Sequence, residues 1–81
     1  MRAARLGSSM IERICFDEDE GSLSIWFRAT GRYVYYGVPA ELYEGLKAAP
    51  SAGRYFNERI KGRFRCEFDP DRRRFRPQRA A

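Results

Sequence analysis

The chain is 81 residues long, which suits one small domain and excludes a large enzyme cleft. Hydrophobic residues make up 43% and aromatic residues 15%, so burying rings is how a chain this short can build a core. The net charge is +5 and the basic residues are almost all Arg, which suits phosphate contacts and base stacking, although a GC-rich genome gives the same bias.

The N-terminal part of the chain predicts an arm and then a strand. Residues 1–9 are small and polar and are expected to form a flexible arm, which places the domain at 10–68. Ile14 and Phe16 alternate with polar or small neighbours, which predicts a strand near 10–17. The acidic run that follows, up to Gly21, is typical of a solvent-exposed turn.

Two further strands follow, with short turns between them that favour an antiparallel meander. In the second strand Leu23, Ile25 and Phe27 share one face, and Trp26 is an unexpected aromatic on the nominally polar face. The third strand covers about 32–36, where three of four consecutive positions are Tyr. Side chains alternate along a strand, so Tyr33 and Tyr35 share one face and Tyr36 points to the other.

Two helices complete the predicted domain. Pro39 suits the first turn of a helix that ends at Ala49-Pro50, and Ser51 is a candidate N-cap for a second helix that stops at Gly62. Residues 63–68 alternate like a short fourth strand or form an extended segment, and residues 69–81 are expected to be a disordered Arg-rich tail.

The predicted fold class is therefore α+β, a three-stranded antiparallel meander followed by two helices (β-β-β-α-α). One sheet face is expected to pack on the helices, and the other to stay open. The predicted core is Ile14, Phe16, Leu23, Ile25, Phe27, Tyr33, Tyr35, Leu42, Leu46, Phe56 and Ile60.

This order of elements resembles the KTSC domain, a short bacterial module that also occurs at the C-terminus of some lysyl-tRNA synthetases. The resemblance covers roughly residues 10–65 and departs from the family at Cys15-Phe16, where Gly and an aromatic are expected. It implies this fold and no catalytic residues. RNA binding is suggested only by the occurrence of the family in lysyl-tRNA synthetases. The matching residues are Ile14, Asp17, Leu23, Ile25, Phe27, Gly31, Tyr33, Tyr35, Val38-Pro39, Leu46, 51–57 and Ile60.

Composition gives little support for catalysis, so no enzyme activity is predicted. The chain has no His for acid–base work, and its clustered carboxylates share one turn with nothing to raise their pKa. No metal site or cofactor is expected, and Cys15 and Cys66 are interpreted as small buried or half-buried residues. With no secretory signal or membrane span in the sequence, the expected location is cytoplasmic.

Aromatic residues of the sheet are the strongest candidates for binding nucleic acid. Tyr33 and Tyr35 either stack on bases or pack under the helices, and in the second case Trp26 and Tyr36 line the opposite face. An exposed Trp26–Tyr36 pair beside Arg13 and Arg28 resembles the way in which small sheets hold single-stranded nucleic acid. Covering of that pair by the arm or the tail is the alternative.

Basic residues gather in the last third, because residues 54–81 carry ten basic and four acidic side chains. The leading hypothesis is a non-catalytic module that binds RNA through phosphates, with stacking by aromatic residues. The alternative is an adaptor for an acidic protein partner or for an added strand at an exposed sheet edge. The segment 51–57 could offer helix N–H groups to an anion, or simply cap a helix. The predicted nucleic-acid-binding residues are Trp26, Arg28, Tyr33, Tyr35, Tyr36, Arg54, Arg59, Lys61, Arg63, Arg65, Arg72, Arg73 and Arg74.

Overall fold

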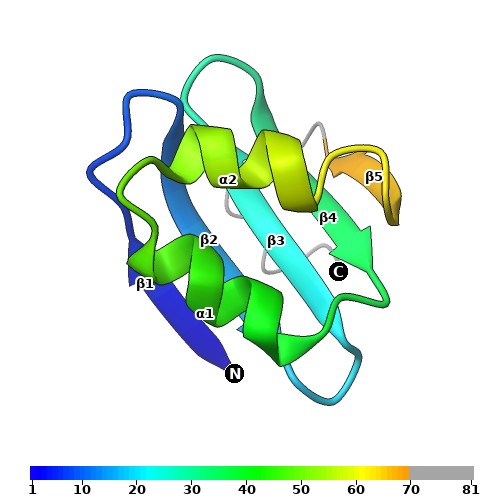
Figure 1. Ribbon diagram of the computed structural model, residues 1–81. Helices are drawn as coiled ribbons and strands as arrows, with labels where there is room; N and C mark the ends of the chain where they lie inside the picture. The colour runs from blue at the N-terminus through cyan, green and yellow to red at the C-terminus, as the bar shows by residue number, and fades with distance from the viewer. Residues whose placement is uncertain (70–81) are drawn as a thin grey trace.

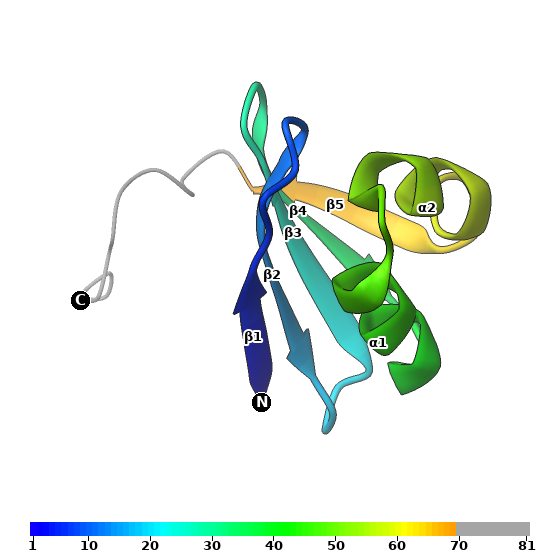
Figure 2. The same cartoon turned by 60° about the vertical axis from the view of Figure 1, so that its left-hand side comes forward.

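The computed structural model, which describes residues 1–69, is a five-stranded sheet with two helices on one face (Figure 1). The helices connect the fourth strand to the fifth, and every pair of neighbouring strands is antiparallel in the order β1-β2-β3-β4-β5. Figure 2 shows both helices on the same side, with no described element over the other face. The elements are β1 (Arg2–Arg5), β2 (Ile11–Asp17), β3 (Ser22–Phe27), β4 (Gly31–Tyr36), α1 (Ala40–Ala48), α2 (Ala52–Arg59) and β5 (Arg65–Asp69).

The α+β class and the central meander are confirmed, but the predicted number of strands is wrong. Residues 2–5 form the edge strand β1, where a flexible arm was predicted. The alternating stretch predicted near 63–68 is a true strand, β5, and its last residue Asp69 was assigned to the tail. The rest of that predicted tail, including Arg72, Arg73 and Arg74, lies outside the described residues.

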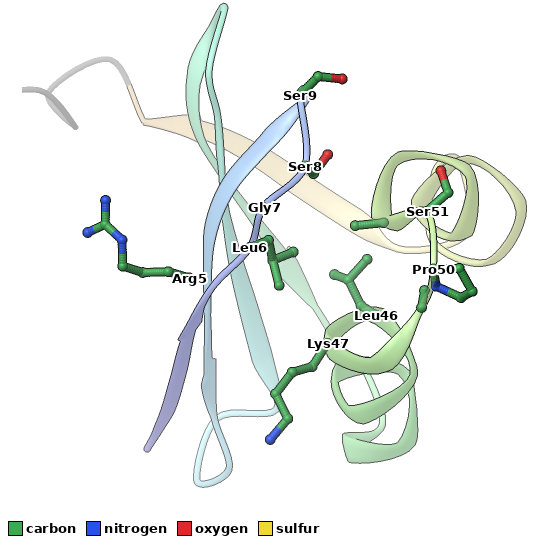
Figure 3. Close-up of a pocket in the computed structure, with 11 residues that line it drawn as sticks. Arg5, Leu6, Gly7, Ser8, Ser9, Leu46, Lys47, Pro50 and Ser51 are labelled. Carbon is green, nitrogen blue, oxygen red and sulfur yellow. The ribbon is translucent and has the colours of Figure 1, made fainter.

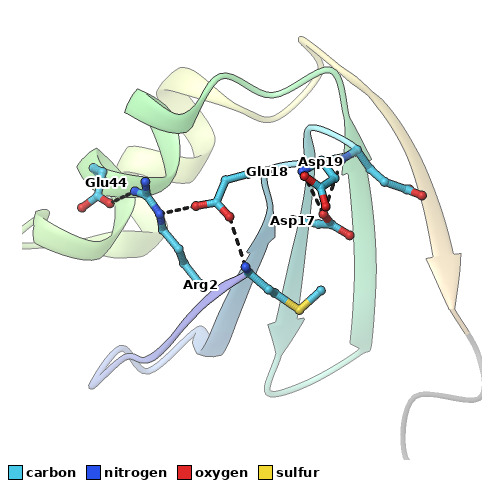
Figure 4. Close-up of polar contacts among 7 residues, drawn as sticks. Arg2, Asp17, Glu18, Asp19 and Glu44 are labelled. Carbon is cyan, nitrogen blue, oxygen red and sulfur yellow. Dashed lines mark hydrogen bonds and ion pairs between the residues drawn. The ribbon is translucent and has the colours of Figure 1, made fainter.

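Charged contacts hold β1 in place where apolar residues are scarce. The Arg2 guanidinium hydrogen-bonds both Glu18 in the β2–β3 turn and Glu44 in α1 (Figure 4). The amino group of Met1 lies 3.1 Å from a Glu18 carboxylate oxygen. The pKa of Glu18 is lowered, first by the hydrogen bond with that amino group and then by the one with Arg2. The edge strand is thereby tied to a turn and to a helix.

A β-bulge explains one core residue that strict alternation assigns to the wrong face. The register of β2 against β3 shifts between Ile11 and Arg13, so that Ile11 and Ile14 both point to the core although they are three residues apart. Arg13 consequently faces away from the helices, opposite Trp26.

The core lies between the sheet and the helices, and it contains the predicted residues. Tyr35 packs against Phe56 of α2 at a ring-centroid distance of 5.7 Å, and Tyr33 contacts Phe27 at 5.6 Å. Both tyrosines are therefore on the helix-covered face, as the packing interpretation held. Phe27, Tyr33 and Leu42 are partly buried at its edge. The buried hydrophobic residues absent from the prediction are Ile11, Val38, Tyr43 and Ala52.

The helices begin at the predicted signals, but α2 ends at Arg59, before the predicted stop at Gly62. Pro39 occupies the N-cap position of α1, and the Ser51 hydroxyl accepts a hydrogen bond from the Arg54 N–H at 3.4 Å to cap α2. The chain turns after α2 at Gly62, whose φ of 77° favours glycine. Tyr55 of α2 packs against Gly45 of α1, where a Cβ would clash with the tyrosine hydroxyl.

Candidate nucleic-acid interface on the open sheet face

The face of the sheet away from the helices, called the open face below, is organised in cross-strand rows. Each strand contributes every second residue, and the strand register aligns these residues side by side. The first row is Arg5, Arg13, Trp26, Arg32 and Asp69. The second is Ala3, Cys15, Ser24, Val34 and Glu67, and the third is Asp17, Ser22, Tyr36 and Arg65.

Trp26 is held between two arginines of the first row. The Arg13 guanidinium carbon lies 4.3 Å from the centroid of the Trp26 ring, and that of Arg32 lies 5.4 Å from it. Arg32 is positioned by its Nη1, which donates to an Asp69 carboxylate oxygen at 2.9 Å. Its buried Nε has no hydrogen-bond partner within residues 1–69. The arrangement is a cation–π row that presents positive charge and a ring together.

Tyr36 occupies the other end of the open face. Arg65 lies over its ring at 4.4 Å, and its hydroxyl donates to Glu67 at 3.1 Å. This hydrogen bond is the main reason why the pKa of Tyr36 is raised. Tyr36 is half-buried, as Trp26 is.

Between the two rings the open face is hollowed, because the residues there are small. Ser22 and Ser24 of β3 form the bottom of a depression of about 400 Å³, which we call the central hollow. Trp26 and Arg32 border it at one end, and Tyr36 and the acidic β2–β3 turn border it at the other.

Most cations of this face lie at one end of the strands, and most carboxylates lie at the other. Arg5, Arg13 and Arg32 lie in the first row, and Arg28 follows β3 at the same end, where its Nε donates to the Ser8 carbonyl at 2.8 Å. The opposite end carries the acidic turn of residues 17–20, where the Met1 amino group pairs with Glu18 and Arg65 lies over Tyr36. An anionic ligand is therefore attracted to the first row and repelled from the turn.

The predicted binding residues do not form one surface. Trp26, Tyr36 and Arg65 share the open face, whereas Tyr35 is only 6% exposed beneath the helices and has no ring face free for a base. Tyr33 lies on the same covered side. The other predicted cations that the structure describes belong to α2 or the turn after it, on the far side of the sheet: Arg54, Arg59, Lys61 and Arg63.

Three of these helix-side cations are already engaged within the protein, since the Arg63 Nε donates to the Glu58 carbonyl oxygen at 3.3 Å and both Arg54 and Arg59 have partners. Arg54 lies 3.5 Å from Glu58, and Arg59 lies over the Tyr55 ring at 5.7 Å. The residue that sequence reasoning missed is Arg32, whose place beside Trp26 depends on the register across the β3–β4 turn. Alternation alone could have assigned Arg32 to the Trp26 side, but it could not have aligned the two side chains.

A second depression, of about 640 Å³, lies between the β1–β2 loop and the α1–α2 turn (Figure 3). Leu6, Leu46 and Lys47 line it, while the Arg5 side chain extends away from it in this view. The Ser51 hydroxyl caps α2, as the capping interpretation of 51–57 held. Anion binding at this helix end stays a prediction.

The two cysteines are free and lie on opposite faces of the sheet. Cys15 is half-buried on the open face, as predicted, but Cys66 is exposed because it lies on the outermost strand. Among residues 1–69, no three His, Cys, Asp or Glu side chains gather as metal ligands would. Neither described helix has the length and apolar character needed to cross a bilayer.

Comparison with known proteins identifies the family. The KTSC domain family matches residues 7–64, which is well over half of the chain. The chain belongs to the KTSC domain family. The crystal structure of a KTSC domain protein from Yersinia pestis superposes with a TM-score of 0.81 at 38% identity, covering 84% of this chain and 96% of that one. The predicted resemblance is thus confirmed.

Relatives of this KTSC domain occur alone and inside a larger protein. A protein of Tsukamurella paurometabola is 43% identical over 59 residues, which are 73% of this chain and 88% of that protein. A lysine–tRNA ligase of Nostoc punctiforme is 37% identical over 73% of this chain, but the match spans only 10% of the ligase. Arg13, Trp26, Arg32 and Tyr36 all lie within the part of the chain that the family matches.

Proposed function

We propose that this KTSC domain is a non-catalytic module that binds single-stranded RNA on its open face. The observation that carries the proposal is the Arg13–Trp26–Arg32 row, which lies on a sheet face that no described element covers. Sheets that recognise unpaired RNA combine cations for the phosphates with flat surfaces for the bases.

The row offers both kinds of contact at one place. Guanidinium groups bind phosphate oxygens and also stack on bases, and a base stacked on an aromatic ring contributes about 1–3 kcal/mol. Arg13 contacts the Trp26 ring and no carboxylate of the described residues, so its N–H donors are available to a ligand. Little sequence specificity follows from phosphate contacts and stacking alone.

The absence of His from the sequence supports a non-catalytic role. Cys15 is the only nucleophilic thiol on the open face of the described chain, and its row neighbours Ala3, Ser24 and Val34 supply no base for it. The Nostoc relative is named as a tRNA ligase, and a KTSC-like segment in such a protein supports an RNA ligand.

Protein binding is the second candidate function, because the sheet has two edge strands, β1 and β5. Phe68 on β5 is 47% exposed, so the edge strand presents an apolar side chain to a partner. An acidic partner or an added strand at β5 would cover it. Mutating the open face would then leave binding of that partner intact.

The test compares two double variants that remove the same charge from opposite sides of the protein. Arg13→Gln with Arg32→Gln alters the open face, and Arg54→Gln with Arg59→Gln alters the helix side. Fluorescence anisotropy with a labelled 12-nucleotide RNA of mixed sequence measures the dissociation constant. We expect the open-face variant to bind about tenfold more weakly, and the helix-side variant to bind within about twofold of the unmodified protein.

Trp26 supplies an independent readout, because it is the single tryptophan of the chain. Its fluorescence should change on RNA binding if the ligand reaches the open face. Equal loss of affinity in both double variants, with unchanged fluorescence, would mean that only the overall charge matters. Absence of RNA binding at low salt would refute the proposal and direct attention to a protein partner.

A further inference from the structure

The central hollow has a polar floor that the fold itself does not use. Ser22 and Ser24 are each 8% exposed and line the hollow, and neither hydroxyl has a hydrogen-bond partner within residues 1–69. Neither hydroxyl oxygen is fully enclosed, so both can bind water in the free protein and a ligand group in its place. The two hydroxyls thus mark the floor as a surface suited to a hydrogen-bonding ligand.

The ends of the hollow differ in chemistry. Trp26 and Arg32 border one end, and Asp17, Glu20 and Tyr36 border the other. Met1 also lines the hollow, and its amino group is engaged by Glu18. On β3 the two ends are four residues apart, from Trp26 to Ser22, or about 13 Å along the strand. A volume of about 400 Å³ is at the small end of ligand pockets, which span roughly 300–1,000 Å³. The hollow therefore fits one small ligand with an anionic end and a hydrogen-bond-donating end.

The acidic end has acceptors to offer. Asp17 Oδ1 accepts hydrogen bonds from the backbone N–H groups of Asp19 and Glu20, at 3.0 and 3.4 Å (Figure 4). These bonds fix the carboxylate and leave its second oxygen without a partner in the described part of the chain. The Glu20 carboxylate likewise has no partner among these residues. These solvent-accessible oxygens can accept N–H donors from a ligand in place of water.

We infer that the central hollow holds one nucleotide of the bound strand and prefers guanine, whose N–H groups reach Asp17 and Glu20 while a phosphate lies at Arg13 and Arg32. This inference rests on the proposed function and adds base selectivity to it. Guanine presents two N–H donors side by side on its Watson–Crick edge, which suits a carboxylate. Uracil presents one donor between two carbonyl oxygens, which a carboxylate repels.

The charge separation on the open face supports this orientation. A phosphate near Asp17 and Glu20 would be repelled, so the base and not the backbone occupies the acidic end. The Ser22 and Ser24 hydroxyls can donate or accept, and therefore tolerate any base edge that passes over them. Selectivity consequently depends on the two carboxylates.

The experiment measures the binding of RNA octamers to the full chain. An all-uridine octamer is compared with octamers that carry one central guanosine, adenosine or cytidine, using anisotropy at fixed salt. We expect the guanosine octamer to bind about tenfold more tightly than all-uridine RNA, because a good bidentate contact discriminates by about 5- to 150-fold. Asp17→Asn and Glu20→Gln should each reduce this ratio toward one. Asn keeps the Oδ1 acceptor that the turn requires.

Asp19→Asn is the matched control, because Asp19 belongs to the same acidic turn but does not line the hollow. It removes one negative charge and should leave the guanosine-to-uridine ratio unchanged. If Asp19→Asn lowers the ratio as much as Glu20→Gln does, turn charge and not a specific contact explains the preference, and the inference is wrong.

The failure of the inference and that of the proposed function give different results. Equal affinity for all four octamers, with the Trp26 fluorescence change retained, would overturn the guanine subsite while RNA binding stands. Absence of binding by every octamer would overturn both. An NMR titration of the isotope-labelled protein with free GMP tests whether the ligand is an RNA strand or a free nucleotide. Millimolar GMP that shifts the Ser22 and Ser24 amide signals supports the subsite, whereas GMP binding tighter than the guanosine octamer overturns the choice of a strand as ligand.

Discussion

At the residue scale, Tyr35 shows how burial couples this fold to pH. Its ring lies against Phe56 under the helices, and burial is the main cause that raises the pKa of its hydroxyl well above the usual value. In the unfolded chain the same hydroxyl ionises near pH 10. Because the folded state keeps the proton and the unfolded state releases it, the stability is full below about pH 10 and falls as the pH rises further.

We therefore expect Tyr35→Phe to flatten the loss of stability in alkaline solution. Between pH 10 and pH 11 the unmodified protein should lose about 1 kcal/mol more unfolding free energy than the variant. Urea denaturation at pH 8, 10 and 11 measures the difference. Tyr36→Phe is the control, since the pKa of Tyr36 is raised chiefly by an exposed hydrogen bond to Glu67, which solvent weakens. Identical slopes for the unmodified protein and Tyr35→Phe would contradict the prediction.

The two sets of aromatic residues also show what alternation can predict. Leu23, Ile25 and Phe27 define the core side of β3, so Tyr33 and Tyr35 on the paired strand had to follow them, and Trp26 had to face away. The role of Arg32 could not be predicted in the same way. Its alignment with Trp26 requires the register of two strands, which depends on the geometry of the turn between them.

At the element scale, β1 marks the limit of sequence patterns. Residues 2–5 contain two Arg and two Ala, so they carry no hydrophobic alternation. The strand exists because β2 offers an unpaired edge and because Glu18 and Glu44 bind Arg2, and these partners are distant in sequence. The bulge in β2 is also not predictable from the sequence, since it reverses the face of Ile11 and no Gly or Pro marks its position. The two helices, by contrast, were predictable from local caps and breakers.

Gly45 controls how closely α1 and α2 approach. Alanine at this position would gain up to about 1 kcal/mol in helix propensity, but its Cβ would collide with the Tyr55 ring. We expect Gly45→Ala to destabilise the protein because the collision outweighs the gain, with an overpacking cost of about 1–3 kcal/mol.

A double-mutant cycle with Tyr55→Ala tests this explanation. Removing the ring should allow alanine at position 45 to stabilise α1, so the two substitutions should couple by about 1–3 kcal/mol in chemical denaturation. An additive cycle, or a Gly45→Ala variant that is more stable than the unmodified protein, would show that Tyr55 moves aside freely.

At the scale of the whole molecule, net charge conceals an uneven arrangement. The charge of +5 is shared between the open face, the helix side and the residues beyond 69. On the helix side Arg54 is paired with Glu58, whereas Arg13 on the open face is stacked on the Trp26 ring. Two proteins with this composition and different strand registers would have the same charge and different binding surfaces.

The tail arginines and the open face should therefore make separable contributions to RNA binding. Replacing Arg72, Arg73 and Arg74 by Gln should weaken binding to every sequence and reduce the salt slope by no more than about 2, at roughly 0.7 for each phosphate of a single strand that the variant no longer neutralises. The Trp26 fluorescence change at saturation should persist, because the open face is unaltered. In the Arg13→Gln, Arg32→Gln variant the slope should fall by about 1.4, and the fluorescence change should disappear as well. Anisotropy and fluorescence at several salt concentrations measure both quantities. If the tail variant shows no Trp26 response at saturating RNA, the tail and not the open face places the ligand, and the cation–π row has no binding role of its own.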